Sequence, residues 1–179
     1  MLSRRPVVNM ASRRQLMNSS FDPLHLVNTY GAFGSVTRER RGVVIEGTRS
    51  AAPDAAAAWL EYQFKAKPGD VRRRPPQVAP YHLRLDWVMW FVALPGRFDD
   101  RWLVALVAKL AAGDRATLRL LRTNPFPGAA PTYVRATLYR YRFSTPAERR
   151  ETGAWWVRTR LGQLLPPVRL EPGADEPSL

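Results

Sequence analysis

The sequence predicts an α+β fold in which an antiparallel β-sheet or β-sandwich carries a helical insert of two to three helices at about residues 86–123. Stretches that alternate apolar and polar residues, as half-buried strands do, lie on both sides of this insert. Within the insert the apolar spacing becomes that of helices, and aspartates precede the apolar runs. Helices grouped together between strands favour an α+β arrangement.

The composition indicates one folded domain with short tails. The chain has 179 residues, of which 45% are hydrophobic and 11% aromatic, which is enough for a core and too many for a largely disordered chain. We expect residues 1–20 to be a flexible lead-in or linker, residues 21–170 to form the domain, and residues 171–179 to be a disordered tail.

The first part of the domain, residues 20–48, is predicted to consist of short strands and turns. Asp22-Pro23 and several glycines interrupt short apolar pieces, as turns do. The β-branched run Val43-Val44-Ile45 is typical of the middle of a strand.

A second strand is predicted at WLEYQFKAK, residues 59–67. Leu60, Tyr62 and Phe64 alternate with polar residues, which indicates an antiparallel strand with one buried face. The proline-rich segment 72–80 that follows is predicted to be an extended connector.

The helical insert is predicted from its caps. Three sites carry an aspartate that can begin a helix: Asp86, Asp99 or Asp100, and Asp114. Pro95-Gly96 ends the first helix after Leu94, Gly113 follows the second, and Asn124-Pro125 stops the third.

The stretch RLDWVMWFVAL, residues 84–94, is too short to cross a membrane, which takes roughly 20 mostly apolar residues. Trp87 and Trp90 are three residues apart, so they share a helix face and are predicted to anchor the helix on the sheet. Arg84 and Asp86 are predicted to pair at the junction of strand and helix. The alternative is that the stretch forms an exposed patch that holds a partner protein.

After the insert, residues 131–143 alternate again and carry bulky side chains on both faces, which predicts a strand buried on both sides. Residues 145–153 are interpreted as a polar connector. Residues 155–170 close the domain, and their pattern does not decide between helix and strand.

The chemistry-bearing residues do not assemble a catalytic centre, so we expect no enzyme activity, metal or cofactor. The chain has no cysteine, and its two histidines lie far apart without a metal-binding motif. There is no nucleophile elbow and no phosphate-binding glycine loop. The net charge is +13, but the bases are 25 Arg and 3 Lys, a bias typical of GC-rich genomes, and we expect no nucleic acid partner.

Several multi-residue blocks occur in a fixed order along the chain: SFDPLHLVNTYGAFGSVTRER, VVIEGT, WLEYQFKAKPGD, RRRPPQVAPYHLRLDWVMWFVAL, LLRTNPFPGAAPTYVRATLYRYRF and LLPPVRL. From about Ser12 to Leu170 they resemble the C-terminal region of the lipase maturation factor family. The amino-acid sequence of these blocks is similar to that of a bacterial, actinobacterial member.

This resemblance implies a non-catalytic domain that assists the folding or assembly of an exported or membrane-associated client, such as a lipase, by transient shielding of apolar surface. Animal members of the family span the endoplasmic reticulum membrane several times, so the resemblance implies association with that membrane in eukaryotes and with the cell membrane in bacteria. This chain by itself reads as soluble. Because residues 1–20 resemble the linker after the last span, we expect a truncated or misassigned start.

Six residues that lie in the matching blocks are candidates for partner binding: Asn28, Tyr30, Arg84, Asp86, Trp90 and Asn124. Two other functions stay open. One is a β-sandwich that binds carbohydrate, with Tyr139 and Tyr141 as an aromatic platform. The other is a basic domain that binds nucleic acid through its arginines.

Overall fold

The computed structural model describes residues 4–12, 16, 18–29, 39–78, 80–94 and 101–169. The chain forms two compact units, Met1–Arg38 and Glu39–Leu179. In the first, helix α1 (Arg5–Ala11) is followed by two short antiparallel strands, β1 (Ser19–Ser20) and β2 (Asn28–Thr29). The Asp22 carboxylate closes the turn between these strands by accepting hydrogen bonds from the backbone N–H groups of residues 24, 26 and 27.

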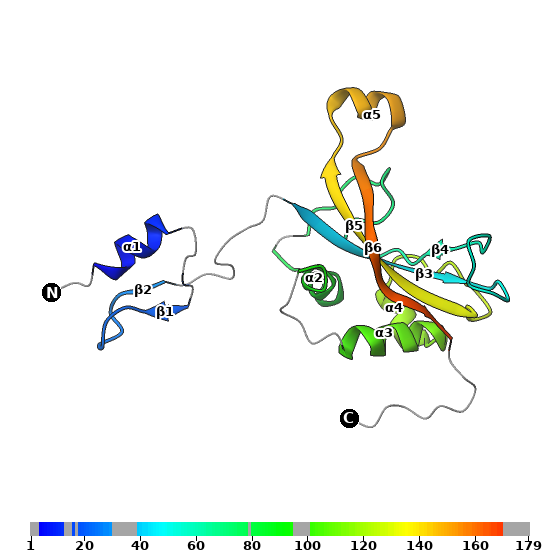
Figure 1. Cartoon of the computed structure of the whole chain (residues 1–179), viewed down its shortest axis with the longest axis horizontal. Coiled ribbons are helices and arrows are strands. Elements are labelled where there is room, and N and C mark those ends of the chain that lie inside the picture. Colours follow the sequence, from blue (N-terminus) through cyan, green and yellow to red (C-terminus); the bar gives the residue numbers. More distant parts are fainter. Residues whose placement is uncertain are drawn as a thin grey trace. The chain divides into compact units, whose positions relative to one another are not determined.

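The second unit contains a four-stranded antiparallel sheet in the order β4-β3-β5-β6 (Figure 1). The strands are β3 (Arg40–Thr48), β4 (Leu60–Glu61), β5 (Tyr133–Phe143) and β6 (Trp156–Val168). Between β4 and β5 come helices α2 (Arg84–Phe91), α3 (Arg101–Ala111) and α4 (Arg115–Leu120), and α5 (Pro146–Thr152) connects β5 to β6. The α+β class and the helical insert at about 86–123 are therefore confirmed.

One face of the sheet packs against the insert, with α2 on β3 and α3 on β5. Every second residue of the two central strands points into this core, which includes Val43, Ile45, Val134, Ala136, Met89, Leu103, Val107 and Leu110. Burying a side chain of the leucine class contributes about 1.5–3 kcal/mol to folding. This core is thus the main source of the unit's stability. In the part of the chain that the structure describes, no helix is long and apolar enough to cross a membrane.

The opposite face of the sheet is also covered, and it buries charge. The Glu46 carboxylate accepts hydrogen bonds from Arg135 Nε (2.9 Å) and Thr137 Oγ1 (3.1 Å). The Arg135 guanidinium lies over the Trp59 ring, 3.8 Å from its centre. On the neighbouring strand, Arg158 forms a two-pronged ion pair with Glu61. Both of these carboxylates are paired with an arginine, which offsets the cost of taking their charge out of water.

Asp86 does not cap α2, contrary to the sequence prediction. The helix begins at Arg84, so Asp86 lies in its first turn and points inward, where Oδ1 accepts hydrogen bonds from the backbone N–H of Ala66 (2.6 Å) and Lys67 (2.8 Å). Arg84 is exposed and, among the described residues, forms no ion pair with Asp86. The pairing failed because residues two apart face different sides of a helix.

The predicted tryptophan anchor of α2 is wrong for Trp87, whereas Trp90 is half-buried and lines a small pocket together with Arg40 and Gly42 of β3. Met89 is fully buried, whereas Trp87 is 44% exposed, and its ring packs edge-on against Phe91 at 4.7 Å. The buried stripe consists of Asp86, Met89 and Ala93. A spacing of three or four residues groups side chains into stripes, but it does not say which stripe faces the sheet.

The segment interpreted as a polar connector is helix α5, and its start is a capping box. Thr145 Oγ1 accepts a hydrogen bond from Glu148 N (3.3 Å), and Glu148 Oε2 accepts one from Thr145 N (2.9 Å). Arg142 donates two hydrogen bonds to the same carboxylate and is the main reason that the pKa of Glu148 falls to about 2. The sequence Thr-Pro-Ala-Glu is the signature of this box.

Of the remaining local predictions, some are confirmed, one is confirmed only in part, and one concerns residues outside the described structure. Asp114 caps α4 by accepting hydrogen bonds from Thr117 N and Oγ1, and Gly113 before it has φ +69°, as a helix end requires. The proposed caps Asp99 and Asp100 lie outside the described residues. The predicted strand at 59–67 is confirmed only at β4, and the closing segment is strand β6.

We predict that Asp86→Ala lowers the free energy of unfolding by about 2–4 kcal/mol, because two buried backbone N–H groups lose a charged acceptor. Arg84→Ala, two residues away and exposed, is the matched control and should stay within about 0.5 kcal/mol of the parent. Urea unfolding of both variants measures this. Equal effects of the two changes would contradict the assigned role of Asp86.

Candidate functional site

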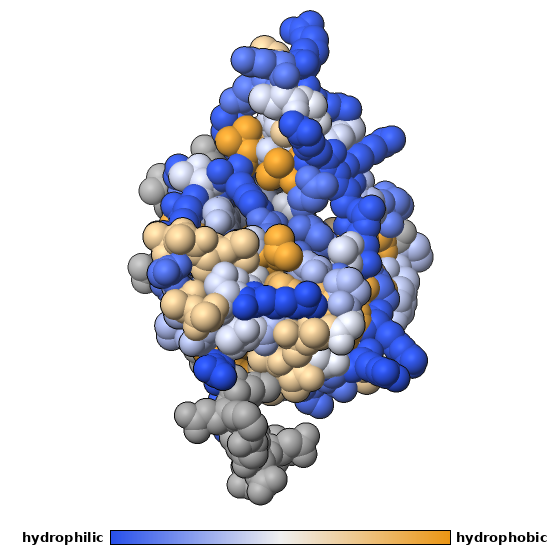
Figure 2. All heavy atoms as spheres, turned by 90° about the vertical axis from the view of Figure 1, so that its right-hand side faces the viewer, coloured by the Kyte–Doolittle hydropathy of each residue, from blue (hydrophilic) through white to orange (hydrophobic). Residues whose placement is uncertain are grey.

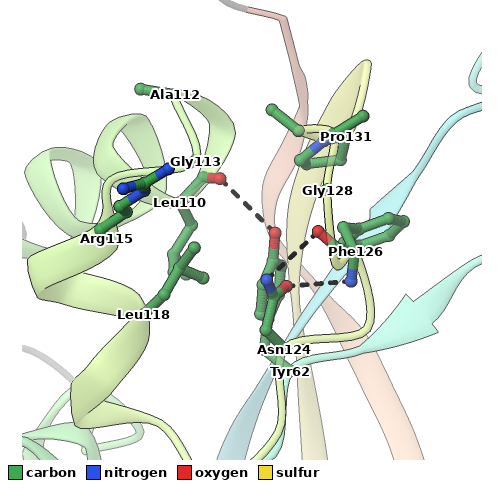
Figure 3. A pocket seen from close by; sticks show the side chains of 12 residues that line it. Tyr62, Leu110, Ala112, Gly113, Arg115, Leu118, Asn124, Phe126, Gly128 and Pro131 are labelled. Atoms are coloured by element: carbon green, nitrogen blue, oxygen red, sulfur yellow. Dashed lines mark hydrogen bonds between the residues drawn. The ribbon is translucent and has the colours of Figure 1, made fainter.

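The second unit has a cleft between the α3–α4 turn and the loop that precedes β5 (Figure 3). Its volume is about 370 Å³. Helical residues form one wall, the loop forms the other, and Tyr62 lies between them. The cleft is lined by Tyr62, Leu110, Ala112, Gly113, Arg115, Leu118, Asn124, Phe126, Gly128, Ala129, Ala130 and Pro131.

Tyr62 forms an apolar floor, with its one polar group turned to the helix. Its hydroxyl donates a hydrogen bond to the Leu110 carbonyl at 3.5 Å, and its ring centre lies 5.7 Å from that of Phe126. Burial raises the pKa of Tyr62 to about 12. The floor is therefore neutral at physiological pH, and because Tyr62 is buried it supports the cleft from below.

The helical wall is positioned by the turn between α3 and α4. Gly113 ends α3 in a left-handed conformation, and Asp114 begins α4 immediately afterwards. A methyl group added at Gly113 would lie only 3.4 Å from the Ala130 side chain, so the turn and the loop come close together at this point. Because the two walls meet here, the cleft is closed at one end.

The loop wall is held at three points. Asn124 forms a side-chain turn, in which Oδ1 accepts a hydrogen bond from Phe126 N (2.9 Å) and Nδ2 donates one to Phe126 O (3.2 Å). The Phe126 ring packs directly on Gly47 of β3, where an added methyl group would lie 2.6 Å from a ring carbon. The Arg49 guanidinium donates a hydrogen bond to the Ala129 carbonyl at 2.7 Å. Together these contacts pre-form the wall.

The charge of the cleft comes from Arg115. Among the described lining residues it alone carries a formal charge, and none is acidic. Arg115 is exposed, and within the described part of the chain it has no ion-pair partner. The neighbouring Asp114 carboxylate is engaged by Thr117, whose hydrogen bonds lower the pKa of Asp114. The cleft thus combines apolar walls with one available cation.

A second, smaller pocket of about 50 Å³ lies where α2 meets the start of β3. Its lining includes Lys67, Asp86, Trp90 and Tyr141. Burial lowers the pKa of Lys67 from 10.5 to about 8, and the Asp86 charge opposes this shift only in part. Oδ2 of Asp86 is buried and has no hydrogen-bond partner among the described residues. The polar groups of this pocket connect α2 to the start of β3, so we assign the pocket a structural role.

Within the second unit, the structure does not bring the residues selected from the sequence into one site. Asp86 and Trp90 line the small pocket, Asn124 lines the cleft, and Arg84 is exposed on α2. Asn28 lies in the first unit and donates a hydrogen bond to the His25 carbonyl at 2.6 Å. Tyr30 lies outside the described residues.

The residues that shape the cleft were missed by the sequence analysis, apart from Asn124. The signal that could have indicated the loop wall is NPFPGAAP, in which a side-chain turn precedes an aromatic residue and a glycine. No local pattern indicates Arg115, because it resembles any solvated helix arginine. The proposed carbohydrate platform is not exposed at Tyr141, which is 3% accessible, and the Arg158 guanidinium lies 4.9 Å from the Tyr139 ring centre.

Comparisons with known proteins agree with one another. A model of the family described as lipase maturation factor C-terminal domain matches residues 26–166. The chain is 51% identical to mouse lipase maturation factor 1 over 170 residues, which are 92% of this chain and 29% of that protein. The human lipase maturation factor 1 is likewise 51% identical, over 92% of this chain and 30% of its own length.

A more distant relative is human lipase maturation factor 2, with 39% identity over 82% of this chain and 20% of that protein. The chain therefore spans less than a third of the curated relatives it matches. No solved structure matches it.

We predict that Lys67 makes stability depend on pH between about 8 and 10.5. In this window the unfolded chain holds a proton on Lys67 that the folded chain has lost, so unfolding takes up a proton and stability rises with pH. The destabilising effect of the buried charge is fully present below pH 8. The free energy of unfolding of the parent should therefore rise with pH through this window, whereas that of Lys67→Met should not. As a result, the variant becomes less stable relative to the parent as pH rises.

Urea unfolding at pH 7.5, 9 and 10 measures this difference. The control is Lys65→Met, because Lys65 is exposed and donates only to the Arg119 carbonyl. Parallel pH profiles for the parent and Lys67→Met would contradict the burial of this charge.

Proposed function

This chain belongs to the lipase maturation factor family, and from that premise we propose that it assists the folding or assembly of a client protein such as a lipase. The family match at residues 26–166 covers most of the chain, including the helical insert and all of the four-stranded sheet except the last two residues of β6. The relatives with 51% identity are both named lipase maturation factor 1. The client is thus proposed from the names of these relatives.

We propose that the domain acts by binding, without catalysis. The observation that supports this is the cleft, whose accessible groups suit transient contact with an apolar side chain: the half-buried Leu118, exposed alanines and a single guanidinium. Among the described residues no group of His, Asp or Glu is placed to hold a metal ion.

A pre-formed cleft suits a chaperone-like role. Since its loop wall is held by Asn124, Gly47 and Arg49, little conformational entropy is lost when a client side chain enters. One buried side chain of leucine size contributes about 1.5–3 kcal/mol. Such a contact shields a folding intermediate and releases it without an external energy source.

We predict that the 179-residue chain, at several-fold molar excess, lowers the aggregation of a denatured lipase during refolding. Binding of exposed apolar segments competes with their association. Light scattering and the recovered lipase activity measure the effect. A basic protein of similar size serves as the control, because the net charge of +13 could act by itself. Identical scattering with and without the chain would contradict the proposal.

We also propose that the domain works beside a membrane, as its resemblance to the animal members implies. An antibody against the domain is expected to detect the native protein in the membrane fraction of cell extracts, in a band well above the 20.3 kDa of this chain. A band near that mass in the soluble fraction alone would contradict membrane residence and leave client binding to be tested in solution.

A further inference from the structure

We propose that the cleft recognises an extended client segment in which a leucine- or phenylalanine-sized side chain is followed two residues later by a carboxylate. This inference rests on the proposed function and specifies the chemistry of the client. It is carried by three features of the described residues: the size of the cleft, its single charge, and the spacing of Arg115 and Leu118 on α4.

The size of the cleft favours one or two side chains. Pockets that enclose complete small ligands have volumes of roughly 300–1,000 Å³, and this cleft, at about 370 Å³ and open to solvent, lies at the small end. Its accessible apolar lining comes from Leu118, which is half-buried, and from the exposed Ala112, Ala129 and Ala130, whereas Leu110 and Phe126 are buried. An apolar anchor from a protein chain fits this space better than a long acyl chain does.

The charge selects the neighbour of that anchor. Arg115 is exposed, has no ion-pair partner among the described residues, and belongs to a lining without any carboxylate. A guanidinium binds a carboxylate with two parallel hydrogen bonds. A second copy of this chain is a poor occupant, because each copy carries a net charge of +13 and the two would repel.

The spacing follows from the helix. Arg115 and Leu118 are three residues apart on α4 and both line the cleft, so the cation and the apolar wall are neighbours, with about 5–6 Å between Cβ atoms at this spacing. In an extended segment, residues i and i+2 point to the same side and lie roughly 6–7 Å apart. The two spacings match, which specifies an apolar residue, any residue, and then Asp or Glu.

The surface outside the cleft explains why a cleft is needed. On the face shown in Figure 2, hydrophilic side chains surround the apolar ones and divide them into small patches. Small, scattered apolar patches are ordinary on soluble domains and do not hold a partner. On this face, an apolar side chain of a client therefore has no large patch to bind.

The test uses fluorescent peptides and the full 179-residue chain. The parent peptide is Ser-Gly-Ser-Phe-Ser-Glu-Ser-Gly, and its binding is followed by fluorescence anisotropy. Replacing its Glu by Gln should weaken binding about two- to fivefold, as loss of an exposed ion pair does. Replacing its Phe by Ala should weaken binding about tenfold or more, because the buried apolar area is lost.

Two variants of the chain locate the site. Arg115→Gln should weaken binding of the Glu peptide about two- to fivefold and leave the Gln peptide unaffected, which identifies the two groups as partners. Ala112→Phe, at an exposed position of the lining, should fill the cleft and weaken both peptides. Arg119→Gln, an exposed residue of the same helix outside the lining, is the matched control. Thermal unfolding confirms that each variant is folded.

Several results would overturn the inference: equal affinity for the Phe and Ala peptides, equal loss with Arg119→Gln and Arg115→Gln, tighter binding of oleate than of the peptide, or dimerisation that Ala112→Phe abolishes. The proposed function has a separate readout. If Ala112→Phe still suppresses lipase aggregation as the parent does, the inference about the cleft is wrong and the maturation role stands. If the peptides bind as expected but aggregation is unchanged, the maturation role is wrong and the recognition stands.

Discussion

The central strands β3, from Val43 to Thr48, and β5, from Tyr133 to Tyr139, are buried or half-buried on both faces, and the rest of the second unit is arranged around this constraint. Nine consecutive residue pairs join them, from Arg40↔Tyr141 to Thr48↔Tyr133. One face carries apolar side chains and therefore requires the helical insert as a cover. The other carries Glu46 and its partners, which withstand burial only because Arg135 and Thr137 satisfy the carboxylate.

The cleft is a consequence of how the two covering segments attach to this sheet. Phe126 packs on Gly47 of β3, and α3 packs on β5, so both walls are fixed to the same central pair of strands. They meet at Gly113 and Ala130 and leave a gap above Tyr62. A site built from rigid elements keeps its shape when empty, so little conformational entropy is lost when it binds.

Much of the fold could be predicted from local patterns. The apolar alternation of β3 and β5 and the Asp114 cap of α4 are properties of short segments, and the structure confirms them. Helix α5 could also have been predicted, since Thr145 and Glu148 have the spacing of a capping box. It was missed because the segment is polar and was interpreted as a connector. The cleft was largely invisible, because its two walls come from segments that are separate along the chain.

The sequence by itself determined the fold class, the position of the helical insert between strands and, through several ordered blocks, the family. These depend on hydrophobic periodicity, capping residues and short sequence motifs, each of which is a property of a few neighbouring residues. Only the tertiary structure decided which stripe of α2 is buried, that Asp86 holds the backbone of Ala66 and Lys67, and that Arg49 holds a carbonyl 80 residues away. The reason is physical: such contacts form between groups that packing brings together, and the same side chain in another packing would have other partners.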